Sequence, residues 1–239
     1  MLGTSVQGRA IEAVRFGPPQ GPPVRLILGG FHGDEPKSVD LARRLCAYLR
    51  AQGGSCPGRT VILVPVVNPD GYARRKRRNA HGVDLNRNFP TADWTAGSAR
   101  SRFYGGKAPA EEPETQAVIR LIETVGPSEI ISLHSISRRR HCNNYDRPAG
   151  RGRSAGALAR AMAECNGYPV TSSIGYSTPG SLGTWAGREL GMAVVTLELP
   201  SHHSPRRCWE DNLAALLVGL EDDGQGPGAE SGGATWRGV

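Results

Sequence analysis

The 239-residue sequence contains few cysteines, few lysines and few aromatic residues, and it has no long apolar run. Its five cysteines are scattered, odd in number and never spaced as CxxC, which argues against a disulfide framework and against a zinc site built from cysteine. No stretch approaches the roughly 18 apolar residues that a membrane-spanning helix needs. The first residues also lack the basic and then apolar pattern of a secretion signal, so we expect a cytosolic protein without a membrane partner.

Arginine carries most of the positive charge of the chain. Three of the 29 basic residues are lysine, which leaves 26 arginines, and the formal net charge is +7. Arginine binds carboxylates and phosphates through two parallel N–H groups, so this composition favours an anionic partner. The run RRKRR at 74–78 is, by composition alone, most typical of a solvated or nucleic-acid-binding segment.

The length and composition predict one folded domain. Apolar residues make up 38% of the chain and charged residues 21%, as in ordinary globular proteins. We expect this domain to cover residues 1–221. Residues 222–239 have no apolar face and are predicted to be a disordered tail.

Short apolar runs alternate with helical periodicity, which predicts an α/β domain with a mostly parallel mixed central sheet and helices on both faces. The predicted strands are Val24–Leu28, Thr60–Val67, Glu129–Leu133 and Ala193–Leu199, with an edge strand near Ala10–Arg15. The predicted helices are Pro36–Ala51, Glu112–Val125, Ser154–Cys165, Leu182–Leu190 and Pro205–Glu221. The segment from 68 to about 110 is rich in Gly, Asn, Arg and Pro, and so long a loop usually indicates function or disorder.

Three of the predicted strands end in residues that bind metals or protons. His32 and Glu35 follow the strand Val24–Leu28 and are three residues apart. His134 comes at the end of the strand that begins at Glu129, and Glu198 lies near the end of the strand that begins at Ala193. Each feature alone has an ordinary alternative: H-x-x-E occurs by chance, a lone histidine usually caps a strand, and an edge carboxylate can face solvent. Together they indicate one site, because the carboxyl ends of parallel strands share a crevice.

Two histidines and one carboxylate with an open position form a catalytic zinc set. Zinc lowers the pKa of a bound water to about 7, and a nearby carboxylate can take its proton. Glu198 is the candidate for that base. In the long loop, Asn68–Gly71 is typical of a turn, and Asn86 and Arg87 offer donors for a substrate carboxylate. Asp84 can orient a metal-bound imidazole, and an arginine from 74–78 can face an oxyanion.

Seven segments together resemble the zinc carboxypeptidase family: GGFHGDEP, VVNPDGY, RNAHGVDLNRNFP, EIISLHS, NNYDRPA, YPVTSSIGYSTPGSLGTW and VVTLELP. They run from about residue 24 to 200, and GVDLNRNF at this distance from H-x-x-E is highly specific. The resemblance implies that His32, Glu35 and His134 bind one zinc ion and that Glu198 is the general acid and base.

The resemblance also implies roles for loop residues. Asn86 and Arg87 match the pair that holds a substrate carboxylate, and Asp84 matches the partner of the first zinc histidine. The arginine that stabilises the oxyanion corresponds to Arg77, with Arg78 and Arg75 as the alternatives if the register shifts.

One departure from the family bears on the substrate. Digestive members carry a mobile tyrosine after G-S-I-x-W, whereas this chain has Ala186 and Gly187 there, with Tyr176 and Tyr145 as candidates to replace it. This favours the amidase branch of the family, which cleaves the γ-D-glutamyl–diaminopimelate bond of murein tripeptides in cell-wall recycling. Such peptides carry several carboxylates, which Arg138–Arg140 would help to bind.

Three alternatives remain from the sequence. A general metallocarboxypeptidase would use the same residues. An N-acyl amino acid deacylase shares the H-x-x-E start, although the NPDG and GVDLNRNF segments argue against it. A nucleic-acid-binding protein with a vestigial zinc set would use RRKRR, but every metal and acid–base position is intact, so we expect a carboxylate-bearing peptide partner and no nucleic acid.

Overall fold

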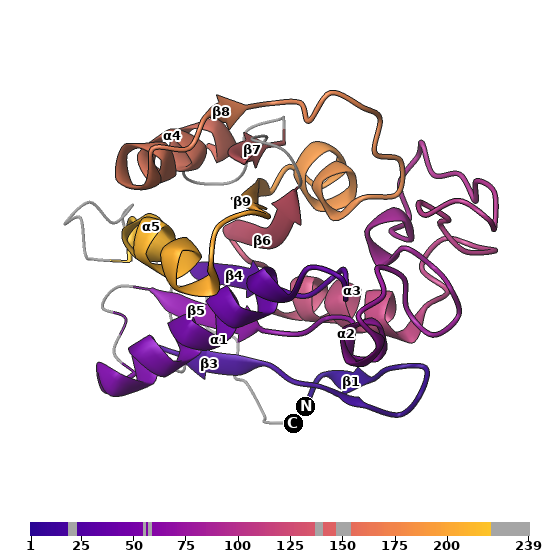
Figure 1. Ribbon diagram of the computed structural model, residues 1–239, viewed down its shortest axis with the longest axis horizontal. Helices are drawn as coiled ribbons and strands as arrows, with labels where there is room; N and C mark the ends of the chain where they lie inside the picture. The colour runs from indigo at the N-terminus through magenta and orange to yellow at the C-terminus, as the bar shows by residue number, and fades with distance from the viewer. Residues whose placement is uncertain (19–22, 55, 57–58, 137–140, 147–153, 221–239) are drawn as a thin grey trace, which may run out of the picture.

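The computed structural model describes residues 1–18, 23–54, 56, 59–136, 141–146 and 154–220. A seven-stranded mixed sheet crosses the molecule in the order β3-β5-β4-β6-β9-β7-β8 (Figure 1). Its strands are β3 (Val14–Phe16), β4 (Val24–Leu28), β5 (Thr60–Val64), β6 (Glu129–Ile136), β7 (Cys142–Tyr145), β8 (Val170–Thr171) and β9 (Ala193–Pro200). A separate two-stranded hairpin joins β1 (Gly3–Thr4) to β2 (Ala10–Ile11).

The centre of the sheet is parallel, as predicted. Strands β5, β4, β6 and β9 run in one direction, whereas β3 and β7 are antiparallel to their neighbours β5 and β9. The parallel strands are apolar along nearly their whole length because both faces of the sheet are covered. Their carboxyl ends therefore meet at one edge of the molecule.

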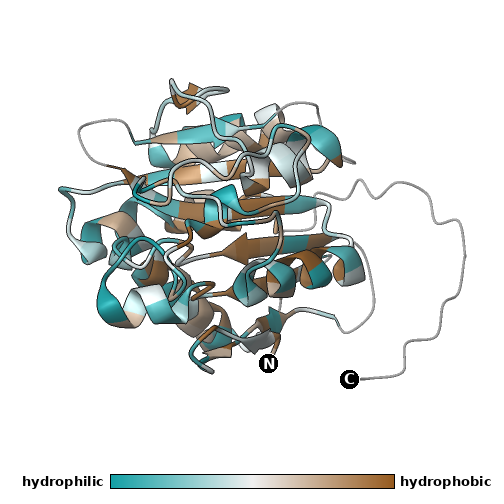
Figure 2. Cartoon of the chain, turned by 90° about the vertical axis from the view of Figure 1, so that its right-hand side faces the viewer, coloured by the Kyte–Doolittle hydropathy of each residue, from teal (hydrophilic) through white to brown (hydrophobic). Residues whose placement is uncertain are grey.

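Helices cover both faces of the sheet. One apolar cluster lies between the sheet and α1 (Pro36–Ala51), α4 (Ala155–Asn166) and α5 (Pro205–Leu217). The other lies between the sheet and α3 (Pro113–Val125) with the π-helical segment η2 (Gly183–Glu189). Figure 2 shows the apolar residues concentrated in the strands and on the inward sides of the helices. Among the described residues, no helix combines the length and the apolar character needed to cross a membrane.

The helix ends follow from local chemistry. Proline begins α1, α3 and α5, where the missing N–H is not needed. Ser154 and Ser204 cap the starts of α4 and α5 by accepting backbone N–H groups. Helices α3 and α4 end at Gly126 and Gly167, both in the left-handed conformation that glycine adopts without strain.

The structure differs from the sequence-based expectation in several places. Asn68–Gly71, expected to be a turn, begins the short helix α2 (Pro69–Arg74), because the Asn68 side chain caps it and proline suits its first turn. The predicted strand from Thr60 ends at Val64. The expected edge strand splits into β2 and β3, and β7 and β8 were not anticipated. Arg138–Arg140 and the tail at 222–239 lie outside the described residues.

Candidate active site

His32, Glu35 and His134 meet at the carboxyl edge of the sheet. His32 follows β4, Glu35 precedes α1 and His134 belongs to β6. Their ligand atoms all lie within 4.8 Å of one another. His32 Nδ1 is 2.8 Å from Glu35 Oε1, and His134 Nδ1 is 3.2 Å from both Glu35 Oε2 and His32 Nδ1. Two imidazole nitrogens and a carboxylate that converge in this way suit a divalent cation such as zinc.

The outward sides of these residues are held by further hydrogen bonds. His32 Nε2 lies 3.0 Å from Asp84 Oδ1. His134 Nε2 lies 3.0 Å from the Ser132 hydroxyl, and the Ser135 backbone N–H donates to Glu35 Oε2 at 3.0 Å. Partners of this kind fix the ring orientation of metal-binding histidines. Sequence reasoning missed both serines, since neither residue type is distinctive beside a strand.

Glu35 occupies the N-cap position of α1, but its side chain does not cap the helix. The carboxylate instead contacts the two histidines. The helix start is completed by Pro36 and by Ser38, whose hydroxyl donates to the Glu35 carbonyl at 2.7 Å. The local sequence therefore directs this carboxylate to the site and away from helix stabilisation.

The electrostatics of the cluster favour a positive charge at its centre. Burial by itself lowers the pKa of His32, but the carboxylates of Glu35 and Asp84 outweigh it and raise that pKa to about 9. Burial by itself raises the pKa of Asp84, but His32 and Arg77 outweigh it and hold that pKa well below its usual range. A cation between these carboxylates is thus stabilised, which is what a metal site requires.

Glu198 lies beside the cluster on the next strand. In the β6–β9 register Glu198 is the direct partner of His134, and it lines the same cavity as His32 and Glu35. It is 8% exposed, and burial, followed by the charge of Glu35, raises its pKa to about 8. A carboxylate whose pKa lies near neutrality is suited to accept and return a proton.

Arg77 is the one of the three candidate arginines that lines this cavity. Its Nε donates to Asp84 Oδ2 at 2.9 Å, and its Nη1 lies 3.5 Å from Glu35 Oε1. Arg78 instead donates to the backbone carbonyls of Ala99 and Ser101. Arg75 is exposed at the left-handed end of α2.

A close backbone contact holds the Arg77 loop against the first motif. A Cβ atom on Gly33 would lie 1.9 Å from the Gly71 carbonyl carbon, so only glycine fits between the two segments. The Asn68 amide also donates to the carbonyls of Phe31 and Arg77, both at 3.2 Å. The HGDE and NPDG segments are therefore packed together as one support for the site.

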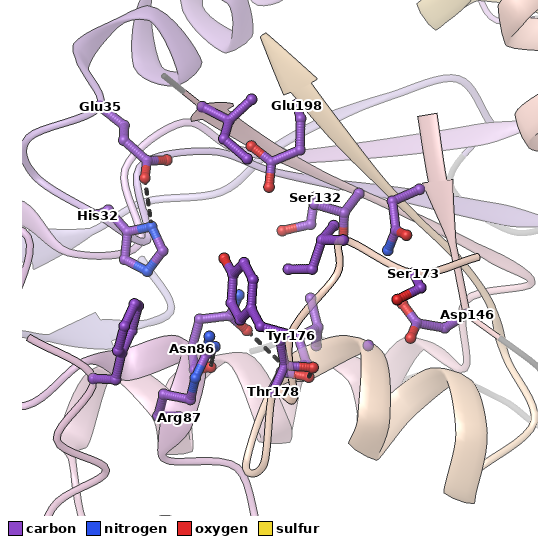
Figure 3. Close-up of a pocket in the computed structure, with 18 of the residues that line it drawn as sticks. His32, Glu35, Asn86, Arg87, Ser132, Asp146, Ser173, Tyr176, Thr178 and Glu198 are labelled. Carbon is purple, nitrogen blue, oxygen red and sulfur yellow. Dashed lines mark hydrogen bonds and ion pairs between the residues drawn. The ribbon is translucent and has the colours of Figure 1, made fainter. Parts of the chain in front are cut away.

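Asn86 and Arg87 form the floor of the cavity next to the cluster (Figure 3). Asn86 Oδ1 accepts the Leu182 N–H at 2.9 Å, which leaves the amide nitrogen of Asn86 for a ligand. Arg87 is 5% exposed and hydrogen-bonds Tyr176. It forms no ion pair within 4 Å with any carboxylate that the structure describes, so this buried guanidinium suits a carboxylate supplied by a ligand.

The cavity has a volume of about 440 Å³ and extends from the cluster to a polar wall that sequence reasoning missed. That wall contains Asn144, Asp146 and Arg188. Tyr176 stands over the floor beside Arg87, whereas Tyr145, the other tyrosine considered, packs against the core and is not among the cavity-lining residues. Of these two tyrosines, Tyr176 is therefore the one that lines the cavity.

Comparison with known proteins agrees with this geometry. The family model described as zinc carboxypeptidase matches residues 1–207. The chain belongs to the zinc carboxypeptidase family. It is 37% identical over 190 residues to murein peptide amidase A of Escherichia coli K12, covering 73% of this chain and 70% of that protein. It is 36% identical over 209 residues to murein peptide amidase A of Vibrio campbellii, covering 83% and 77%.

A solved relative shows that the similarity extends to the fold. The crystal structure of murein-tripeptide amidase MpaA from Escherichia coli O157 matches with a TM-score of 0.71 and 33% identity, covering 92% of this chain and 90% of that one. The single α/β domain with a mixed sheet is therefore that of zinc carboxypeptidases, as the sequence predicted, and this zinc carboxypeptidase is a hydrolase.

Proposed function

We propose that this zinc carboxypeptidase hydrolyses the γ-D-glutamyl–meso-diaminopimelate bond of murein tripeptides in the cytoplasm, as a step of peptidoglycan recycling. The observation that carries the proposal is the joint placement of His32, Glu35, His134 and Glu198 beside a buried Arg87 that forms no ion pair with a described carboxylate. The amidases of Escherichia coli and Vibrio campbellii that this chain resembles support the choice of substrate.

The residues fit one zinc ion. His32, Glu35 and His134 would hold it, with Asp84 and Ser132 orienting the two imidazoles. When bound, zinc supplies Lewis-acid polarisation and an acidified water. The other chemistry belongs to side chains of the protein.

Substrate docking is assigned to the cavity floor. The carboxylate next to the scissile amide binds the Arg87 guanidinium and the free amide nitrogen of Asn86. This places the scissile carbonyl next to Arg77, whose Nη1 points towards Glu35 and can donate to the oxygen as negative charge develops there. Arg77 is held for this role by Asp84.

Proton transfer is assigned to Glu198. The carboxylate takes a proton from the attacking water, and the C–N bond then breaks as Glu198 returns that proton to the leaving amine. The products are the dipeptide L-Ala-D-Glu and free diaminopimelate. Water supplies the hydroxyl of the new glutamyl carboxyl group and the hydrogen of the released amine. The raised pKa of Glu198 suits both directions of this transfer at neutral pH.

The test is an assay of zinc-loaded protein on L-Ala-γ-D-Glu-meso-diaminopimelate, with mass spectrometry of the products. We expect dipeptide and free diaminopimelate, loss of turnover in EDTA and recovery with zinc. N-acetylaspartate, succinylglutamate and a peptide with an ordinary C-terminal amino acid are assayed in parallel. Preferential cleavage of either acyl amino acid would indicate a deacylase, and preferential cleavage of the ordinary peptide would indicate a general carboxypeptidase.

A further inference from the structure

Two hydrogen-bond acceptors face the cavity from strand β7 and the residue after it. Asn144 and Asp146 are two residues apart, so their side chains project from the same face of this extended segment. They are 8% and 7% exposed. Asn144 Oδ1 is buried without a hydrogen-bond partner among the described residues. Within the part of the chain that the structure describes, the one cation near the Asp146 carboxylate is Arg188, whose Nε lies 3.5 Å away, which is too long for a hydrogen bond.

The fold makes room for Asp146 at a specific place. A Cβ atom on Gly183 would lie 2.1 Å from Asp146 Oδ2, and one on Gly187 would lie 2.6 Å from Asp146 Cβ. The two glycines of η2 therefore form a notch that the aspartate fills. Figure 3 shows Asp146 on the side of the cavity opposite His32, with Tyr176 between them in this view.

A buried carboxylate that accepts no hydrogen bond from the described residues is costly for the free protein. Burial raises the pKa of Asp146 to about 6, although Arg188 opposes this shift. Buried acceptors that receive no hydrogen bond are rare in native structures, and two of them at one wall of the described cavity indicate donors supplied by a ligand. An alkylammonium group carries three N–H donors and one positive charge, which matches one amide oxygen and one carboxylate.

Arg188 adds the complementary charge. Its guanidinium lines the same cavity, and its side chain is 51% exposed, so it can bind a carboxylate at the cavity mouth. One wall thus offers acceptors for an ammonium beside a donor for a carboxylate. These are the two groups that an α-amino-acid head presents on a single carbon.

We infer that Asn144, Asp146 and Arg188 form a recognition site for the distal amino-acid head of the leaving residue, with Asp146 binding its ammonium and Arg188 its carboxylate. This inference rests on the proposed function, in which diaminopimelate docks one carboxylate at Arg87 and extends the rest of its side chain along the cavity. The site selects a residue with a second zwitterionic centre over lysine, which has the ammonium alone.

The test compares four tripeptides that differ only in the last residue: meso-diaminopimelate, L-lysine, L-2-aminopimelate and L-2-aminoheptanoate. They present both distal groups, the ammonium alone, the carboxylate alone and neither. For the wild-type protein we expect diaminopimelate to be preferred in kcat/KM at least tenfold over aminopimelate. The preference over lysine should be about three- to tenfold, because Arg188 is half exposed.

Variants separate the two contacts. Asp146→Asn should raise KM for diaminopimelate and abolish its advantage over aminopimelate, with little change in kcat for aminopimelate. Arg188→Gln should abolish the advantage over lysine and preserve the advantage over aminopimelate. Glu210→Gln, which removes an exposed charge paired with Arg206 on α5, is the matched control and should change neither ratio. An unchanged diaminopimelate-to-aminopimelate ratio in Asp146→Asn would overturn the inference.

Binding measurements separate this inference from the proposed function. Calorimetry with free meso-diaminopimelate needs no turnover. If the wild type cleaves none of the peptides but binds diaminopimelate, and Asp146→Asn weakens that binding at least tenfold, the recognition site stands and the proposed reaction falls. If the tripeptide is cleaved but neither binding nor selectivity depends on Asp146, the reaction stands and the recognition site falls. Absence of both cleavage and binding overturns both.

Discussion

Asparagine at position 146 should make the protein more stable at alkaline pH, although it removes a charge that we assign to substrate recognition. Asp146 is 7% exposed, and burial raises the pKa of its carboxyl from 3.8 to about 6. The fold therefore favours the neutral acid, yet the group is ionised at pH 8. A shift of about two pKa units corresponds to about 3 kcal/mol of free energy of unfolding.

The pH dependence follows from the direction of this shift. Asparagine resembles the neutral acid and does not titrate. Its advantage over aspartate should be complete above pH 6, where the folded carboxyl is ionised, and should be lost as the pH falls from 6 towards 3.8. At pH 8 we expect a gain of about 3 kcal/mol, or roughly 6–12 °C in Tm for a domain of this size. About half of that gain should remain at pH 5.

Urea unfolding followed by tryptophan fluorescence at pH 8, 6.5 and 5 measures the gain. Both proteins are treated with EDTA so that metal content does not differ. Glu210→Gln, which removes an exposed charge, should leave the free energy of unfolding nearly unchanged at every pH. The reasoning is wrong if Asp146→Asn is no more stable than the wild type at pH 8, or if its advantage is the same at every pH.

Four further changes test the assignments at the cleft. Glu198→Gln should lower kcat by about 10²- to 10⁴-fold with zinc content, measured by mass spectrometry, unchanged; normal turnover would exclude Glu198 as the proton carrier. Arg87→Ala should mainly raise KM for the tripeptide, and an unchanged KM would place carboxylate binding elsewhere. Asp84→Asn should weaken zinc binding about 10- to 100-fold in a chelator competition, and full affinity would show that the His32 contact is dispensable. Asn68→Ala should lower the free energy of unfolding in urea by about 1 kcal/mol or more, since Asn68 caps α2 and donates to Phe31 and Arg77; a smaller loss would contradict this.

The sequence predicted the centre of the fold because burial on both faces leaves a simple pattern. Strand β4 and helix α1 were predicted with their observed bounds. The short apolar run of β4 indicates a buried strand, and the periodic run of α1, which begins with proline, indicates a helix. The same logic brought His32, Glu35, His134 and Glu198 to one edge, because parallel strands end together. Their roles as ligands and base stay predictions.

The missed elements have sequences without such a pattern. Strand β7 reads CNNY, with Asn144 at the cavity and Tyr145 against the core, so it has no apolar run that indicates a strand. Helix α2 begins with Asn-Pro-Asp-Gly, a composition equally suited to a turn, and only the capping contact of Asn68 decides between them. Asp146 was not singled out, because its meaning depends on the notch that Gly183 and Gly187 form 37 and 41 residues later.

The antiparallel strand β7 places the residues assigned to substrate recognition apart from those assigned to bond cleavage. The groups assigned to bond cleavage lie after β4, before α1, after α2 and on β6 and β9, while the far wall is supplied by β7, the residue after it and η2. Mutations at 144 and 146 can therefore alter which side chain fits while the reacting centre keeps its geometry. With this layout, substrate specificity can change through substitutions in one wall of the cavity while the catalytic residues stay the same.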